Sequence, residues 1–127
     1  MTNPAAITGI AQIAISVKDI GPALAFYRDV LGLTFLFQPG PGLAFLQCGD
    51  TRLMLSTPNS DTEPRSDPIL YFRVADIQAA CDQLRKRGVT IRTEPHVIAQ
   101  LETRDVWLTH FHDPDGHFVS LMSETTR

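Results

Sequence analysis

The sequence has little basic charge and no long apolar run. Eleven lysines and arginines stand against 14 acidic residues, so the formal net charge is −3. A nucleic-acid-binding domain normally carries a basic patch, and a membrane-surface segment carries a block of basic residues; neither is present here. No apolar stretch approaches the roughly 20 residues that span a bilayer. The composition therefore predicts that neither nucleic acid nor a membrane is a partner.

Cysteine is also scarce. The two cysteines, Cys48 and Cys81, stand far apart in the sequence and form no Cys-x-x-Cys pair. A disulfide framework is not expected, and the start of the chain shows no basic segment followed by an apolar one. Together these absences predict a cytoplasmic protein. At 127 residues and 43% hydrophobic content, the chain is large enough to form one domain with its own core.

What is present is an internal repeat. The segments Ile13–Ile20 and Leu70–Ile77 both alternate apolar and polar residues and both end in Asp-Ile. Alternation with period two is typical of a half-buried strand, and after each Asp the apolar spacing becomes helical. Asp19 and Asp76 are expected to cap these helices. A glycine follows each predicted helix, so each half begins with a strand, a helix and a glycine.

The rest of each half is strand-like and interrupted by turn residues. Further strands are predicted at Thr34–Gln38, Leu43–Cys48, Thr51–Ser56, Thr90–Arg92, Asp105–His112 and His117–Ser123. The segment Glu94–Glu102 is interpreted as irregular, either a lid carrying His96 or a plain connecting loop.

These elements make two βαβββ modules within a single domain of residues 1–127. Module one covers about 8–57 and module two about 68–125. The stretch between them, about 58–67, is rich in Pro, Ser, Asp and Glu and is interpreted as a linker. The predicted fold class is therefore α+β.

The last hairpin is specific enough to predict its register. Asp113-Pro-Asp-Gly116 fits a type I turn followed by a left-handed glycine. The predicted pairs are Asp113 with His117, His112 with Phe118, and His110 with Ser120. His117 then points away from the face shared by the other two histidines, so a metal held by all three is not expected. His112 is expected to be solvated at the strand end, and Trp107 to pack beneath the sheet.

The motifs quoted above resemble one known family. Ile13–Ile20, Ala25–Gly32 and Asp113–Gly116, set in paired βαβββ modules, resemble the vicinal oxygen chelate superfamily. That group includes glyoxalase I, bleomycin-resistance proteins, fosfomycin-resistance enzymes and extradiol dioxygenases. The resemblance covers nearly the whole chain. It implies curved mixed sheets around a cavity, helices on the outer face, and a homodimer.

The resemblance also implies where a metal centre would lie. In metal-using members the ligands come from four strands, at positions occupied here by Gln12, Met54, Ile69 and Ser120. These side chains are poor ligands for a divalent metal, because they bring no charge and only one hard amide oxygen and one hydroxyl. We therefore expect no metal cofactor. The alternative is a divalent metal held by relocated ligands, namely Gln12, His110 and Glu124.

Strand alternation then indicates which side chains face the implied cavity. The predicted ligand-binding residues are Gln12, Arg52, Met54, Ser56, Tyr71, Arg73, Phe118, Ser120, Met122 and Glu124, with His96 if its segment forms a lid. Two arginines facing one cavity favour a carboxylate, phosphate or enolate-like oxygen. Their alternative partners are the carboxylates of Glu94, Glu102 and Glu124.

His110 is the candidate catalytic residue. It faces the same cavity and is either an acid/base or ligand-anchoring group, or a hydrogen-bonded core histidine. Three functions stay open. The preferred one is metal-free binding of a small, partly apolar molecule with an anionic group, either to sequester it or to act on it through His110. The others are a metal-dependent lyase, isomerase or dioxygenase, and a non-catalytic partner or regulatory domain.

Overall fold

The computed structural model describes residues 5–57 and 67–126. The chain divides into two compact units, Met1–Glu63 and Pro64–Arg127. Nearly all of the predicted linker at about 58–67 lies outside the described residues. No helix in the described part of the chain is long and apolar enough to cross a membrane.

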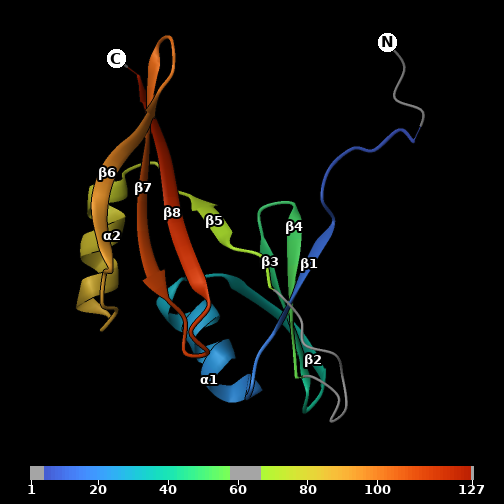
Figure 1. The fold of residues 1–127 in the computed structure, drawn as a ribbon. Coiled ribbons are helices and arrows are strands. Elements are labelled where there is room, and N and C mark those ends of the chain that lie inside the picture. The colour runs from blue at the N-terminus through green and yellow to red at the C-terminus, as the bar shows by residue number, and fades with distance from the viewer. Residues whose placement is uncertain (1–4, 58–66, 127) are drawn as a thin grey trace. The chain divides into compact units, whose positions relative to one another are not determined.

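The first unit is a βαβββ module (Figure 1). Its elements are β1 (Gln12–Ser16), α1 (Ile20–Ala25), a π-helical turn (Phe26–Val30), β2 (Thr34–Gly40), β3 (Leu43–Cys48) and β4 (Thr51–Ser56). The strand order in the sheet is β1-β4-β3-β2. β1 runs parallel to β4, and the other neighbours are antiparallel.

The second unit repeats this plan. Its elements are β5 (Leu70–Arg73), α2 (Ile77–Lys86), β6 (Thr93–Gln100), β7 (Arg104–His112) and β8 (Phe118–Thr126). The strand order is β5-β8-β7-β6, with β5 parallel to β8 and the other neighbours antiparallel. The predicted α+β fold of paired βαβββ modules is therefore confirmed.

The helix boundaries lie where the sequence predicted them. The carboxylates of Asp19 and Asp76 each accept a hydrogen bond from a backbone N–H of the first turn, at 3.3 and 3.1 Å. Such a side chain satisfies one of the free N–H groups at a helix start. Gly32 and Gly88 follow the helices with φ of 83° and 90°, a conformation that glycine adopts with little cost.

Each unit buries the face of its sheet that lies under its helix. The buried residues of the first unit include Ile15, Leu24, Tyr27, Ala44, Leu46, Leu53 and Leu55, and those of the second include Ile77, Cys81, Leu84, Phe111, Val119 and Leu121. In β4 the buried Leu53 and Leu55 alternate with Arg52, Met54 and Ser56, and in β8 Val119 and Leu121 alternate with Phe118, Ser120 and Met122, which were predicted to face the cavity. We call the opposite side of each sheet its helix-free face.

The interpretation of Glu94–Glu102 as irregular was wrong, and so was the strand predicted at Thr90–Arg92. The strand is β6, eight residues long, and it lies at the edge of its sheet. Pro95 lies within this strand, which is possible because an edge strand tolerates a residue that has no N–H to donate. The alternation of a half-buried strand is present: Glu94, His96, Ile98 and Gln100 are exposed, and the residues between them are half-buried.

The predicted register of the last hairpin is confirmed. The backbone N–H of Asp113 donates to the carbonyl of His117 at 3.1 Å. The ladder continues with the pairs His112–Phe118 and His110–Ser120. Gly116 has a φ of +88°, as the turn requires.

Replacing Gly116 with alanine is expected to lower the free energy of unfolding by about 1 kcal/mol, because an L-residue is strained at this φ. Gly40 is the matched control, since its φ is not positive and an added Cβ there meets nothing within 4 Å. Gly40→Ala should change stability by less than about 0.5 kcal/mol. Urea unfolding of both variants is the measurement, and equal effects would contradict the assigned turn.

Candidate ligand-binding site

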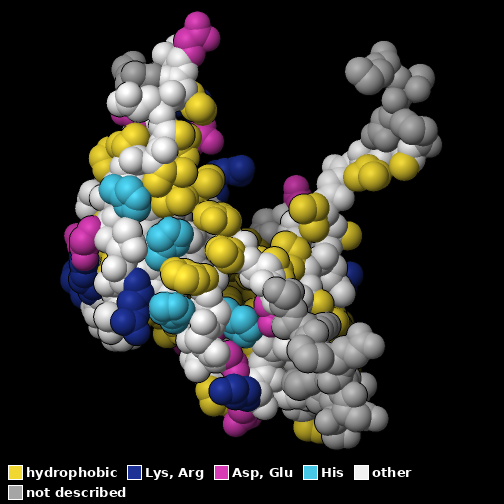
Figure 2. Space-filling view, in the orientation of Figure 1, with side chains coloured by type: hydrophobic (Ala, Val, Ile, Leu, Met, Phe, Trp, Pro, Cys, Tyr) yellow, Lys and Arg dark blue, Asp and Glu magenta, His cyan; other side chains and the backbone are white. Residues whose placement is uncertain are grey.

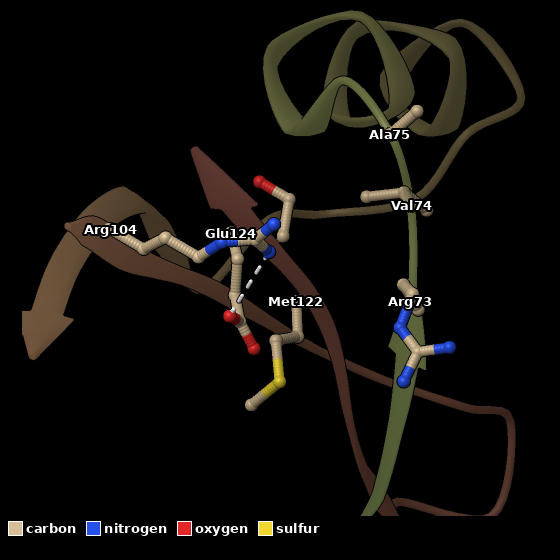
Figure 3. Close-up of a pocket in the computed structure, with 7 residues that line it drawn as sticks. Arg73, Val74, Ala75, Arg104, Met122 and Glu124 are labelled. Carbon is tan, nitrogen blue, oxygen red and sulfur yellow. Dashed lines mark ion pairs between the residues drawn. The ribbon is translucent and has the colours of Figure 1, made fainter. Parts of the chain in front are cut away.

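The second unit contains a pocket of about 550 Å³ where β5 runs beside β8. We call it the Arg73 pocket. It is lined by Arg73, Val74, Ala75, Arg104, Met122, Ser123 and Glu124 (Figure 3). This volume lies within the range of roughly 300–1,000 Å³ that small-molecule sites occupy. Three predicted ligand-binding residues, Arg73, Met122 and Glu124, are brought together here.

The charges in this pocket do not cancel. Arg104 and Glu124 form an ion pair with 3.6 Å between Nη1 and Oε1. In residues 5–57 and 67–126, no carboxylate lies within ion-pair distance of Arg73. Glu94 pairs with Arg85 of α2 instead of with Arg73. The pocket therefore carries a net positive charge and one guanidinium that can bind an anion in a forked geometry.

The pocket also has an apolar surface. Figure 3 shows Met122 between Arg73 on one side and the Arg104–Glu124 pair on the other. Val74 and the carbon stems of the arginines extend this surface. Charge at one wall and a thioether in the middle suit a molecule with an anionic end and an apolar body. Arg104 was missed by sequence reasoning because the strand was predicted to begin one residue later, at Asp105.

His110 lies on the helix-free face of the same sheet and is held by a neighbour. Its Nδ1 is 2.5 Å from the hydroxyl oxygen of Ser120, whose side chain is fully buried. This bond fixes the imidazole ring and leaves Nε2 as the nitrogen that can meet a ligand. Ser120 pairs with His110 and lies two residues before Met122 on this face of β8. Two residues of strand span about 7 Å, so His110 lies about that distance along the strands from Met122.

Two exposed aromatic residues share the helix-free face with His110, and one of them contacts it. The ring of Phe118, 46% exposed, lies 5.5 Å from the His110 ring in an edge arrangement and 4.7 Å from the His112 ring. Tyr71 is 48% exposed and pairs with Ser120 across the β5–β8 ladder. Figure 2 shows histidine side chains among hydrophobic ones on this side of the second unit. His112 was predicted to be solvated, but its ring packs against that of Phe118.

The remaining predicted binding residues lie in the first unit. Gln12 pairs with Arg52 across the β1–β4 ladder, and Ser56 ends the same strand. The amide nitrogen of Gln12 donates to the sulfur of Met54 at 3.8 Å. Arg52 lies 5.8 Å above the ring of Phe45, which is a cation–π contact and not the carboxylate pair considered as its alternative. Phe45 was missed, although alternation from Leu46 places it on the helix-free face.

The four positions at which the family holds a metal do not suit a divalent cation in this chain. Gln12 and Met54 are bonded to each other, and Ser120 is bonded to His110. Ile69 has no donor atom. No carboxylate or imidazole stands at any of the four positions, and a thioether is a soft ligand.

The relocated set considered above meets a geometric obstacle. Ser120 pairs with His110, and Glu124 lies four residues further along β8. Four residues of strand span about 13 Å. In this structure the His110 ring is held by Ser120 and the Glu124 carboxylate pairs with Arg104, so the two side chains are engaged elsewhere and do not converge on a common ion.

A different group of potential ligands is formed by Asp113, Asp115 and His117, whose ligand atoms lie within 4.8 Å of one another. Both nitrogens of His117 are already bound, Nδ1 to Asp113 at 2.7 Å and Nε2 to Asp67 at 2.9 Å. Burial alone would lower the pKa of His117, but hydrogen bonds and charges from the two aspartates outweigh it and raise that pKa. The cluster thus holds the hairpin turn to the start of the second unit.

His96 and the cysteines contribute little to the site. His96 is exposed on β6, and its Nδ1 lies 2.9 Å from the Glu94 carbonyl oxygen, so it does not belong to a lid. Burial raises the pKa of both Cys48 and Cys81. A thiol with a raised pKa is a poor nucleophile at neutral pH.

Comparison with known proteins gives a family and several relatives. Residues 9–121 match the family model described as Glyoxalase/Bleomycin resistance protein/Dioxygenase superfamily. The chain is 29% identical to the metallothiol transferase FosB of Staphylococcus epidermidis, over 95% of this chain and 85% of that protein. Among solved structures it is similar to TnmS3, an antibiotic binding protein from Streptomyces sp. CB03234. That match has a TM-score of 0.73, 26% identity, and coverage of 94% of this chain and 98% of the other.

A lactoylglutathione lyase from Agrobacterium tumefaciens has the same fold. Its TM-score is 0.75 at 21% identity, covering 93% of this chain and 95% of the other. These matches agree with the resemblance to the vicinal oxygen chelate superfamily that the sequence motifs indicated.

Proposed function

Because the chain belongs to the Glyoxalase/Bleomycin resistance protein/Dioxygenase superfamily, we propose that it binds a small, partly apolar molecule with an anionic group, without a divalent metal. The observation that carries this proposal is the Arg73 guanidinium, which lines a pocket and has no carboxylate partner among residues 5–57 and 67–126. Similarity to TnmS3, an antibiotic binding protein, supports a binding role.

In this proposal each part of the pocket has a separate task. Arg73 forms two hydrogen bonds with a carboxylate or phosphate, and Met122 contacts the apolar body of the ligand. The body then extends along the helix-free face toward Phe118 and Tyr71, whose exposed rings offer stacking surfaces. The homodimer implied by the family resemblance stays a prediction, which light scattering tests.

A second candidate function is metal-free acid/base chemistry on the bound molecule. It is favoured by one observation: the hydrogen bond between Ser120 and His110 orients the imidazole ring, which lies about 7 Å along the strands from Met122. In this case Nε2 of His110 exchanges a proton with the ligand, and Ser120 is a positioning residue. A reaction that His110→Gln abolishes while binding stays intact would support catalysis over sequestration.

The proposal predicts that Arg73→Gln weakens the binding of aromatic acids about 10- to 100-fold, because a charge-assisted pair of hydrogen bonds is worth roughly 1.5–3 kcal/mol. The measurement is a thermal-shift screen with benzoate, phenyl phosphate and larger aromatic acids, in buffer containing a chelator. Arg92→Gln is the matched control, since Arg92 is exposed and lies outside the pocket. An equal loss in both variants would contradict a specific role for Arg73.

Elemental analysis of protein purified without a histidine tag separates this proposal from a metal-dependent lyase, isomerase or dioxygenase. We expect less than about 0.1 equivalent of any transition metal per chain, because the family's ligand positions lack suitable donors. A stoichiometric metal that survives dialysis would overturn the metal-free proposal. Asp113→Asn would then show whether the Asp113, Asp115 and His117 group holds it.

A further inference from the structure

The Arg73 pocket contains a carboxylate as well as a cation. β5 ends at Arg73, whereas β8 continues past Met122, the partner of Arg73 in the ladder, to Glu124 and beyond. The N–H of Val74 still donates to the carbonyl of Met122 at 2.9 Å, and from there the chain turns into α2. The stretch of β8 that carries Glu124 therefore has β7 on one side and the pocket on the other.

The Glu124 carboxylate is accessible and only loosely held. Its side chain is 41% exposed, and its one ion pair in the described part of the chain joins it to Arg104 at 3.6 Å. That distance is longer than a hydrogen bond, and no N–H or O–H group of the described residues donates to this carboxylate. Glu124 is therefore able to accept a hydrogen bond from a ligand while Arg104 stays beside it.

The charges around Glu124 decide which kind of donor fits. An ammonium group on the ligand would place a second cation beside Arg104, and a second carboxylate would face the negative charge of Glu124. A neutral hydroxyl or amide N–H avoids both repulsions and still donates to a charged acceptor. The pocket thus favours a ligand that combines one negative charge with one neutral donor.

The spacing of the two charged walls decides where that donor lies on the ligand. Arg73 pairs with Met122, and Glu124 lies two residues further along β8, a step of about 7 Å. Figure 3 shows the Met122 side chain between Arg73 and the Arg104–Glu124 pair. A ring that packs on Met122 can therefore direct one substituent to Arg73 and the opposite one to Glu124.

We propose that Glu124 selects the ligand of the Arg73 pocket, an aromatic acid with a neutral hydroxyl or amide N–H on the side of the ring opposite its anionic group. This proposal rests on the anion binding proposed above for Arg73 and adds a second point of recognition. Arg73 binds the anion, Met122 contacts the ring, and the Glu124 carboxylate accepts from the neutral donor. Arg104 is a positioning residue, which holds Glu124 through their ion pair. The apolar body of a larger ligand still extends from the ring toward Phe118.

Four para-substituted benzoates test this, with NMR titration in buffer containing a chelator as the measurement. Para-(hydroxymethyl)benzoate should bind about three- to tenfold more tightly than para-toluate, whose methyl group cannot donate. Para-(methoxymethyl)benzoate, an ether that accepts but does not donate, should gain nothing over para-toluate. Terephthalate, with a second carboxylate in the same place, should bind no more tightly than para-toluate, because that carboxylate faces Glu124.

Glu124→Leu removes the acceptor and leaves Arg104 without this partner. In this variant the preference for para-(hydroxymethyl)benzoate should disappear, and terephthalate should become the tightest of the four, because two guanidiniums then face its two carboxylates. Asp50→Asn is the matched control, since it removes one negative charge from an exposed turn of the first unit and should leave the wild-type order unchanged. An unchanged order in Glu124→Leu, or the same reversal in Asp50→Asn, would overturn the proposal.

The variant Arg73→Gln separates a failure at Glu124 from a failure of the proposed function. Equal binding of para-(hydroxymethyl)benzoate and para-toluate to the wild type, with both weakened in Arg73→Gln, would show that the role assigned to Glu124 is wrong and that anion binding by Arg73 stands. If Arg73→Gln weakened the binding of none of the four compounds, the proposed function would fail and the role of Glu124 would fail with it.

Discussion

Replacing Phe111 with alanine is expected to lower the free energy of unfolding by about 4 kcal/mol, because it opens a large cavity in a packed core. Phe111 is fully buried on the side of the β7–β8 hairpin that faces α2. Its neighbours on that side include Val119, which pairs with it across the ladder. Urea unfolding followed by the fluorescence of Trp107, which lies in β7, reports on the unit concerned.

Phe118→Ala is the matched control. Phe118 is a phenylalanine of the same hairpin, but it lies on the helix-free face and is 46% exposed. Its replacement should cost less than about 1 kcal/mol, since it forfeits only the ring contacts with His110 and His112. If the two variants were destabilised equally, the assignment of the sheet's two faces would be wrong.

Replacing Asp113 with asparagine is expected to cost about 2 kcal/mol. The Asp113 side chain is fully buried and accepts hydrogen bonds from the backbone N–H groups of Asp115 and His117, at 3.0 and 2.8 Å, and contacts the His117 ring. Asparagine keeps the shape but loses the charge that these donors face. Asp50→Asn, in an exposed turn of the first unit, is the control and should change stability by less than about 0.5 kcal/mol.

The same cluster predicts a dependence of stability on pH. Because the pKa of His117 is raised in the folded protein, the charged imidazole stabilises the fold fully at a pH below its unfolded pKa. That contribution is lost as the pH rises through the raised folded value. The difference in unfolding free energy between the wild type and His117→Gln should therefore be largest near pH 6 and smaller near pH 9. A constant difference, or one that grows with pH, would show that the ring is not held in its charged form.

Most of the fold could be predicted because its determinants are local. Alternation located the strands, and the capping positions of Asp19 and Asp76 located both helix starts. The Asp113–Gly116 turn fixed the register that pairs His110 with Ser120. Strand β6 was missed because Pro95 hides the alternation of an edge strand, where tertiary contacts decide the outcome.

The candidate site was predictable only in part. The alternation of side chains along the strands was enough to place Arg73, Met122 and Glu124 on one face of the sheet, and the structure brings these three together. That alternation could not show that Arg104, on a neighbouring strand, would pair with Glu124 and leave Arg73 without a carboxylate partner among the described residues. That outcome depends on the lengths and directions of side chains across two strands, which a pattern of residue types does not contain.

The packing around the imidazoles was equally beyond the sequence. His112 was predicted to be solvated, yet its ring lies 4.7 Å from that of Phe118. The register had paired the two residues, but ring orientation follows from side-chain packing and not from backbone pairing. The buried hydroxyl of Ser123 has no hydrogen-bond partner among the described residues, and this could not be predicted either, because it depends on every neighbouring donor and acceptor.

The most direct test of metal-free anion binding is a calorimetric titration of the best aromatic acid from the thermal-shift screen into chelator-treated protein. We expect a dissociation constant that chelation leaves unchanged and that Arg73→Gln raises about 10- to 100-fold. Binding that disappears with chelator and returns with added divalent metal would contradict it. So would an affinity that Arg73→Gln does not alter.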